Sequence, residues 1–219
     1  MTKTRFNLPK YTLSEELFNS ISHGIGACLS VAALVLCVVR AAFLSTAAGV
    51  VGAAIYGATL VIMYCMSTLY HAITNQTARY VFRVFDHTSI YLLIAGTYTP
   101  ITLVTLKGPM GWTLFGIVWG IAVLGIIFNS INIERFKKFS MVSYIVMGWA
   151  VVIGANQMIS RLPKGGLLFL LLGGIAYTVG IIFYALKKKK YMHSVWHFFV
   201  LAGSILQFFA IYIYVLPVR

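Results

Sequence analysis

Two histidines of this 219-residue chain, His193 and His197, have the spacing of a metal site on a helix. They lie in the segment KKKKYMHSVWHFF, which spans residues 187–199. Residues four apart share one face of a helix, and two imidazoles in this arrangement are typical zinc ligands. A third nitrogen ligand from another helix would leave the fourth tetrahedral position open, which is the pattern of a catalytic zinc site. We expect His71 to be this third ligand.

The composition indicates an integral membrane protein. Hydrophobic residues make up 60% of the chain and charged residues 10%, whereas a soluble domain carries about 25% charged residues. A net charge of +13 could indicate nucleic-acid binding, but the basic residues lie between long apolar runs instead of along one exposed face, so we exclude that class. Each span needs about 20 residues, so no room is left for a separate soluble domain. The cysteines, Cys28, Cys37 and Cys65, form no C-x-x-C pair, which favours packing roles.

Apolar runs between charge clusters predict an all-α bundle of seven transmembrane helices. The predicted helices cover residues 21–42, 46–70, 86–106, 111–131, 139–160, 166–186 and 193–216. We therefore predict a short cytoplasmic N-terminal segment, residues 1–20, followed by a single membrane domain, residues 21–219. Pro100 falls inside the third run, where its missing N–H predicts an interruption of the helical hydrogen bonds.

The distribution of lysine and arginine predicts the orientation in the membrane. Segments on the side of the N-terminus hold twelve of the 17 basic residues, and the opposite side holds five. Since loops rich in lysine and arginine stay in the cytoplasm, we expect the N-terminus in the cytoplasm and the C-terminus outside it. We interpret the four lysines at 187–190 as an anchor to anionic lipid on the cytoplasmic side.

Seven spans bring polar clusters that are distant in the sequence to one membrane face. The first, third and seventh predicted helices start on the cytoplasmic side, where the second helix ends. These four helix ends carry the polar residues Glu16, Asn19 and His23, then Ser67 and His71, then Asp86 and His87, and finally His193 and His197. Ionisable groups near hydrocarbon are costly unless they pair, bind a metal or face water, so their convergence predicts a functional site. For one histidine alone, an interfacial position would be the simpler interpretation.

Four segments, EELFNSISH, STLYH, DHTSIYLLIAGTYTP and HSVWH, resemble the hemolysin III family. This family is the bacterial branch of the progestin and adipoQ receptor group, which includes the adiponectin receptors. The resemblance covers nearly the whole chain, with the motifs in the family's order. Because the group is similar to the alkaline ceramidases, the resemblance implies a protein of the bacterial cytoplasmic (inner) membrane, with seven helices and Zn2+ held by three histidines at the cytoplasmic helix ends.

The resemblance also implies roles for individual residues. It implies three zinc ligands, His71, His193 and His197. It places two polar residues around the metal, Ser67 and Asp86. A first-helix motif of the family, whose role it leaves open, matches Glu16, Asn19 and His23. His87 has no ligand role to carry over, and we expect it at the membrane interface.

A zinc site just beneath the membrane surface favours hydrolysis of a lipid amide or ester. Zinc lowers the pKa of its bound water to about 7 and polarises a carbonyl. Asp86 could move the proton to the leaving group, and Ser67 could hydrogen-bond beside it. The alternative is a zinc-braced sensor or regulator of membrane homeostasis without turnover. In both cases the expected partner is a membrane lipid, as substrate or ligand. A hemolysin-like pore is a weaker alternative, because channels carry a polar stripe through several spans and these spans are largely apolar.

Overall fold

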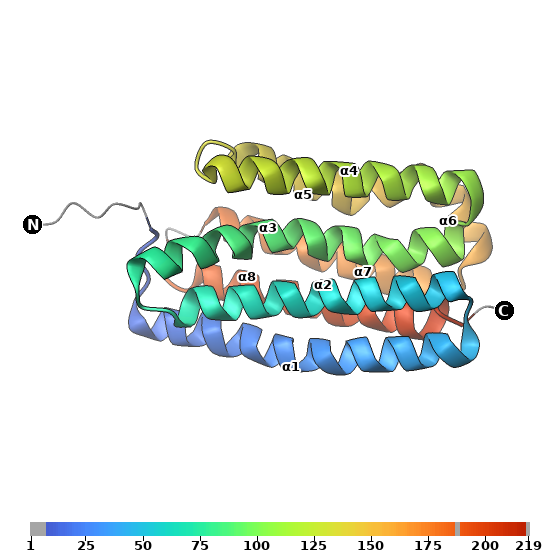
Figure 1. The fold of residues 1–219 in the computed structure, drawn as a ribbon, viewed down its shortest axis with the longest axis horizontal. Helices are drawn as coiled ribbons and strands as arrows, with labels where there is room; N and C mark the ends of the chain where they lie inside the picture. The colour runs from blue at the N-terminus through green and yellow to red at the C-terminus, as the bar shows by residue number, and fades with distance from the viewer. Residues whose placement is uncertain (1–7, 187–188, 218–219) are drawn as a thin grey trace, which may run out of the picture.

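Seven long helices run side by side in the computed structural model of the chain, which describes residues 8–186 and 189–217 (Figure 1). Within this part of the chain, seven helices are long and apolar enough to cross a membrane, which confirms the predicted seven-transmembrane fold. Parts of two predicted features, the lysine run at 187–190 and the N-terminal segment 1–20, lie outside the described residues, as does Arg219.

The helices follow one another through short connections. Their bounds are α1 (Leu13–Leu44), α2 (Ala47–Ala72), α3 (Gln76–Pro100), η1 (Ile101–Leu106), α4 (Gly108–Asn132), α5 (Lys137–Trp149), η2 (Ala150–Gly154), α6 (Ala155–Arg161), α7 (Lys164–Ala185), α8 (Met192–Phe209) and η3 (Ala210–Val215). The third span is α3 with η1, the fifth is α5 with η2 and α6, and the seventh is α8 with η3. One end of the bundle, named here the N-terminal face, is where α1, α3, α5 and α8 begin and where α2, α4 and α7 end.

The outer surface of the bundle is apolar, as a lipid environment requires. Phe43, Trp112 and Leu168 are among the large apolar side chains that are exposed along the helices. An exposed apolar surface of this extent is typical of a face that contacts lipid or another apolar partner. Small residues let helices approach inside the bundle: a Cβ at Gly57 of α2 would lie 2.6 Å from Cα of Leu34 in α1.

The first helix begins eight residues earlier than the hydropathy pattern predicts. α1 starts at Leu13 instead of residue 21, because Thr12 and Glu15 form a capping box at its N-terminus. The Thr12 N–H donates to Glu15 Oε2 at 2.9 Å, and the Glu15 N–H donates to Thr12 Oγ1 at 3.4 Å. The motif T-L-S-E is a sequence signature of this cap. The predicted N-terminal segment therefore contains the first two turns of α1.

The third helix also begins earlier, by ten residues. α3 starts at Gln76, where the Asn75 side chain caps it by accepting hydrogen bonds from two backbone N–H groups of the first turn. The loop predicted over 71–85 is therefore limited to residues 73–75. Arg79 and Arg83 made this segment resemble a loop, but each donates to a glutamate and lies along the helix.

The predicted interruption at Pro100 is confirmed. α3 ends at this residue, and the span continues as the π-helix η1. Proline has no N–H to donate, so regular α-helical bonding cannot continue through it. The fifth span is interrupted as well, by the 3-10 segment η2, which the apolar pattern over 139–160 did not predict.

An odd number of spans places the two ends of the chain on opposite faces. Because of the excess of basic residues on the N-terminal face, we expect a reporter fused near Lys138, at the start of α5, to read as cytoplasmic. A reporter fused after Arg219 should read as extracytoplasmic. Paired fusions to alkaline phosphatase and to a fluorescent protein measure both positions, and cytoplasmic signals from both would contradict the orientation.

Candidate metal centre

The three predicted ligand histidines come together at the N-terminal face. His71 lies in the last turn of α2, whereas His193 and His197 lie in the first two turns of α8. The Nε2 atom of His193 is 3.3 Å from Nε2 of His71 and 3.3 Å from Nε2 of His197. All three side chains are buried, and one ring nitrogen from each lies within 4.8 Å of the others. The group can therefore hold a metal ion.

The spacing of the nitrogens fits a tetrahedral metal. Zn–N bonds of about 2.0–2.1 Å with tetrahedral angles place two ligand nitrogens about 3.3–3.4 Å apart, which is the separation of both neighbouring pairs. Imidazole nitrogens also suit copper, iron and nickel, so the donor set by itself indicates a transition metal and leaves its identity open. Three protein nitrogens would occupy three of the four positions around a tetrahedral metal, which is the open pattern of catalytic sites.

His71 is oriented by Glu16 of α1. The Nδ1–H of His71 donates to Glu16 Oε2 at 2.7 Å, and Arg79 of α3 donates to the other carboxylate oxygen. A carboxylate on the outer nitrogen of a metal-binding imidazole fixes its tautomer and its orientation. The Nε2 lone pair of His71 is therefore free to face the other histidines. This contact gives Glu16, whose role the sequence left open, a positioning function.

His197 is oriented in a similar way by Ser22. The Ser22 hydroxyl donates to the backbone oxygen of Asn19 at 3.0 Å, so it can accept from Nδ1–H of His197 at 3.4 Å. The Nε2 lone pair of His197 then also faces the group. Lone pairs of adjacent imidazoles that point at one another repel, and a shared cation or proton removes this repulsion. The hydrogen bonds to Glu16 and Ser22 turn the Nε2 lone pairs of His71 and His197 towards one another, so they favour a cation bound between the three histidines.

The start of α8 is attached to α1 by two further hydrogen bonds. The Tyr191 N–H donates to Glu15 Oε1 at 2.8 Å, and the Ser194 hydroxyl donates to Asn19 Oδ1 at 2.6 Å. A carboxylate at a helix N-terminus is also favoured by the helix dipole. Asn19 therefore positions the turn that carries His193, which is the second role that the first-helix motif acquires in the structure.

His23 packs against the group without joining it. Its ring stacks on His197 with centroids 3.6 Å apart and an interplanar angle of 15°. The side chain is fully buried, and its ring nitrogens have no hydrogen-bond partner among the described residues. Since ligand nitrogens must point at the metal, a ring stacked face to face on a ligand contributes packing instead.

The two residues predicted around the metal, Ser67 and Asp86, are both buried close to it. Ser67 lies one turn before His71, and its hydroxyl neighbours the Asp86 carboxylate without a hydrogen bond to any described residue. Asp86 is outside the group of three ligands but acts electrostatically on His71. Its Oδ2 is 3.4 Å from Nδ1 of His87.

His87, which we expect at the membrane interface, has a largely buried side chain that packs between helices of the bundle. Only 15% of its side chain is exposed, and its Nε2 is 3.3 Å from the Tyr184 hydroxyl of α7. The Tyr144 hydroxyl of α5 donates to its backbone oxygen at 2.7 Å. Tyr184 and Tyr144 lie on α7 and α5, and the spacing of the histidines in the sequence does not indicate that these two helices contact the site.

Among the residues that contact the site but were not singled out from the sequence are Tyr11, Glu15, Ser22 and Arg79. Glu15 belongs to the T-L-S-E capping signature, which could have identified it as part of the first helix. Arg79 was assigned to a loop because of its charge. Tyr11 precedes every apolar run, and no spacing rule indicates its position.

The ligand set predicts metal loss in two alanine variants. We expect the purified wild type to carry about one zinc ion per chain, and we expect His193→Ala and His197→Ala to lose most of it, because only two nitrogen ligands remain. His23→Ala removes an equally buried histidine from outside the ligand group and should keep the metal. Elemental analysis of the purified proteins measures all four samples, and unchanged zinc in both ligand variants would refute the assignment.

The contact between Glu16 and His71 predicts a weaker metal affinity in Glu16→Gln. The amide keeps the size of the side chain but removes the charged acceptor, and loss of such a partner lowers metal affinity about 10–100-fold. Glu134→Gln, which changes a glutamate paired with Arg83 on the same face, is the matched control. Competition with a chromogenic chelator measures both affinities. Equal affinities in the two variants would show that Glu16 does not orient the ligand.

The chain is similar to known proteins over nearly its whole length. A family model described as Haemolysin-III related matches residues 11–208. The chain is 45% identical to Hemolysin-3 of Bacillus cereus over 205 residues, which cover 94% of each protein, and 43% identical to the Hemolysin-3 homolog of Bacillus subtilis (strain 168) over 208 residues, which cover 95% of this chain and 98% of that protein. It is 26% identical to the monocyte to macrophage differentiation factor of Homo sapiens over 166 residues, 73% of this chain and 68% of that protein. The chain belongs to the haemolysin III family.

Proposed function

We propose that this membrane protein is a zinc-dependent hydrolase of a lipid amide or ester. The observation that carries the proposal is the position of Asp86, which lines an apolar cavity between the helices and also acts on the histidine group. A carboxylate between a metal site and an apolar cavity can serve a substrate whose reactive carbonyl joins a polar head to an acyl chain.

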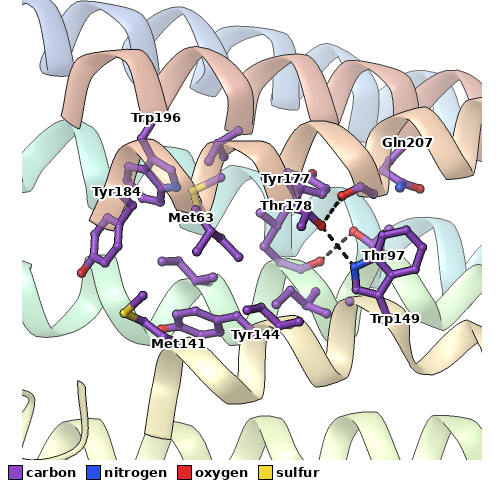
Figure 2. Close-up of a pocket in the computed structure, with 18 of the residues that line it drawn as sticks. Met63, Thr97, Met141, Tyr144, Trp149, Tyr177, Thr178, Tyr184, Trp196 and Gln207 are labelled. Carbon is purple, nitrogen blue, oxygen red and sulfur yellow. Dashed lines mark hydrogen bonds between the residues drawn. The ribbon is translucent and has the colours of Figure 1, made fainter. Parts of the chain in front are cut away.

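The cavity lies between α2, α3, α5, α7 and α8 (Figure 2). Its volume is about 120 Å³, and it is only partly enclosed. Met63, Met141, Tyr144 and Trp196 are among the side chains that surround it. A protein cavity of about 150 Å³ binds benzene, so this one can admit part of an acyl chain while the remainder extends through the opening. Flexible methionine side chains allow such a cavity to adapt to its contents.

Each polar residue of the site has a role in the proposed reaction. The three histidines hold the zinc, which when bound supplies a Lewis acid and a nucleophile at neutral pH. Asp86 accepts the proton of the attacking water and transfers it to the leaving amine or alcohol. The Ser67 hydroxyl, which makes no hydrogen bond to a described residue, is available to donate to the substrate oxygen. Glu16 holds His71 in its ligating tautomer.

The proposal includes a location. The excess of basic residues on the N-terminal face supports insertion in the cytoplasmic membrane of a bacterium with this face towards the cytoplasm. The substrate would then reach the site from the cytoplasmic leaflet, because the cavity extends from Asp86 into the apolar part of the bundle.

A zinc-braced regulator is the second candidate. The observation that favours it is the network that joins helix ends around the histidines: Glu16 connects α1 to α2 and α3, and Asn19 connects α1 to α8. A metal shared by His71 and α8 would complete this network as a brace. A pore is less well supported, because the cavity is largely apolar and only partly enclosed.

Asp86→Asn separates the two candidates. The amide keeps the size of the side chain but cannot accept a proton, so the hydrolase predicts near-wild-type zinc content and melting temperature with a rate loss of about 10²–10⁴. Fatty-acid release from a panel of acyl amides and esters in lipid nanodiscs measures the rate. Glu134→Gln again serves as the control and should keep full activity.

The regulator predicts a different pattern. The zinc-replete wild type would release no fatty acid from any lipid, and His71→Ala would lower the melting temperature in proportion to the zinc lost. Loss of zinc from Asp86→Asn would contradict its proposed role, since it would show that Asp86 is itself a ligand.

A further inference from the structure

A second pocket lies at the face of the bundle opposite to the histidine group. It is formed where the third span ends, where α6 is followed by α7 and where η3 ends (Figure 1). Its volume is about 400 Å³, and it is partly open. Two cationic residues, Lys107 and Arg161, border it together with apolar residues that include Val104, Leu162 and Val215. A ligand of this pocket would therefore meet positive charge and hydrocarbon side by side.

Arg161 is fixed by the protein and still has donors to offer. It lies at the end of α6, and its Nη1 donates to the backbone oxygens of Thr105, at 3.2 Å, and of Leu106. Its other guanidinium nitrogens, Nε and Nη2, have no hydrogen-bond partner among the described residues. The planar fork of a guanidinium matches the oxygens of a phosphate. Arg161 is thus held by the end of the third span and can donate to a bound anion.

Lys107 brings a second positive charge to the same part of the pocket. It directly follows Leu106, whose backbone oxygen accepts from Arg161, so its backbone lies next to the guanidinium. The Lys107 side chain makes no hydrogen bond or ion pair with any described residue. Its φ of 38° is a conformation that residues other than glycine rarely adopt. A glycine would fit this turn with less strain, so the turn by itself does not explain the lysine.

No acidic side chain balances these two charges. The whole sequence has four acidic residues, Glu15, Glu16, Asp86 and Glu134, and all of them lie towards the N-terminal face. Like charges that border one pocket repel each other, and an anion bound between them removes the repulsion. The pocket therefore has the charge of an anion site.

The depth of the pocket in the bundle indicates which anion fits. It lies at the ends of three spans, where a membrane changes from hydrocarbon to head groups. Tyr214 borders it, and Trp112 is exposed near the start of α4 at the same face. Tryptophan and tyrosine are typical of this depth. A phospholipid places a phosphate beside apolar groups at the same level, whereas a free phosphate would leave the apolar half of the lining unused.

We propose that this pocket binds the phosphate of an anionic phospholipid. Arg161 and Lys107 donate to the phosphate oxygens, and the apolar residues contact the glycerol and the first acyl carbons. Basic pockets between transmembrane helices bind anionic head groups in other membrane proteins. The bound lipid joins the ends of the third, fifth and seventh spans and so stabilises their packing. The site is independent of the proposed hydrolase, because it lies at the other end of the bundle from the histidines.

Cross-linking by a photoreactive phosphatidylglycerol tests the proposal at this pocket alone. The full chain is placed in phosphatidylcholine nanodiscs with a small fraction of the probe, and the labelled residues are mapped by mass spectrometry of its peptides. We expect labelling at the pocket to fall about tenfold in Lys107→Gln and in Arg161→Gln, the usual effect of losing a hydrogen bond to a charged group. Lys164→Gln removes the same charge at the start of α7, outside the pocket lining, and should be labelled as the wild type is.

The ligand class is tested by two further measurements. A phosphatidylcholine with the same photoreactive group should label the pocket more weakly than phosphatidylglycerol, and added inorganic phosphate should leave the labelling unchanged. Displacement of the probe by inorganic phosphate would overturn the lipid as the source of the phosphate.

Lys107→Gln keeps the test decisive if Arg161→Gln fails to fold. Its side chain has no contact to lose, so we expect a wild-type melting temperature. Equal labelling of the pocket in the wild type and in Lys107→Gln, or equal labelling by the two lipids, would overturn the anion site. None of these measurements involves zinc or turnover, so their outcome is separate from that of the proposed hydrolase.

Discussion

The hydrogen bond between His71 and Glu16 connects the candidate metal site to the fold. It joins α1 to α2, and through Arg79 it joins both helices to the start of α3. A buried carboxylate without partners would cost several kcal/mol, so His71 and Arg79 stabilise the position of the first turns of α1. This position of α1 brings Glu15 and Asn19 to the start of α8, and with them the other two ligand histidines.

Asp86 has both polar neighbours and apolar surroundings. It is within electrostatic reach of His71, it neighbours Ser67 and His87, and it is one of the residues that line a largely apolar cavity. A water-soluble substrate could bind to the polar residues but not in the apolar cavity, and a hydrocarbon could bind in the cavity but not to the polar residues. A lipid amide or ester satisfies both, and its carbonyl lies where the two environments join. The proposed hydrolase follows from this junction, whereas the histidine group alone would support a brace equally well.

Much of the site could be predicted because helix geometry is regular. The spacing of His193 and His197 places both on one helix face, and seven spans bring His71 to the same end of the bundle. The starts of α1 and α3 were predicted too late, since hydropathy assigns charged residues to loops even where they are paired and helical. Glu16 and Arg79 are such residues. Capping signals at Thr12 and Asn75 indicate the true helix starts more directly than apolar content does.

The sequence by itself determined the number of spans and the end of the bundle at which the ionisable groups gather. The physical reason is that backbone groups in lipid must be paired within helices of about 20 apolar residues, so the positions of such runs decide both. Only the tertiary structure decided which polar groups touch. That Glu16 pairs with His71, that His23 stacks on His197 and that Tyr11 stacks on His193 depends on how segments distant in sequence pack together. A shift of a few ångströms between helices decides whether a side chain can bind the metal or only lies beside it. Side-chain packing across the whole bundle sets these distances.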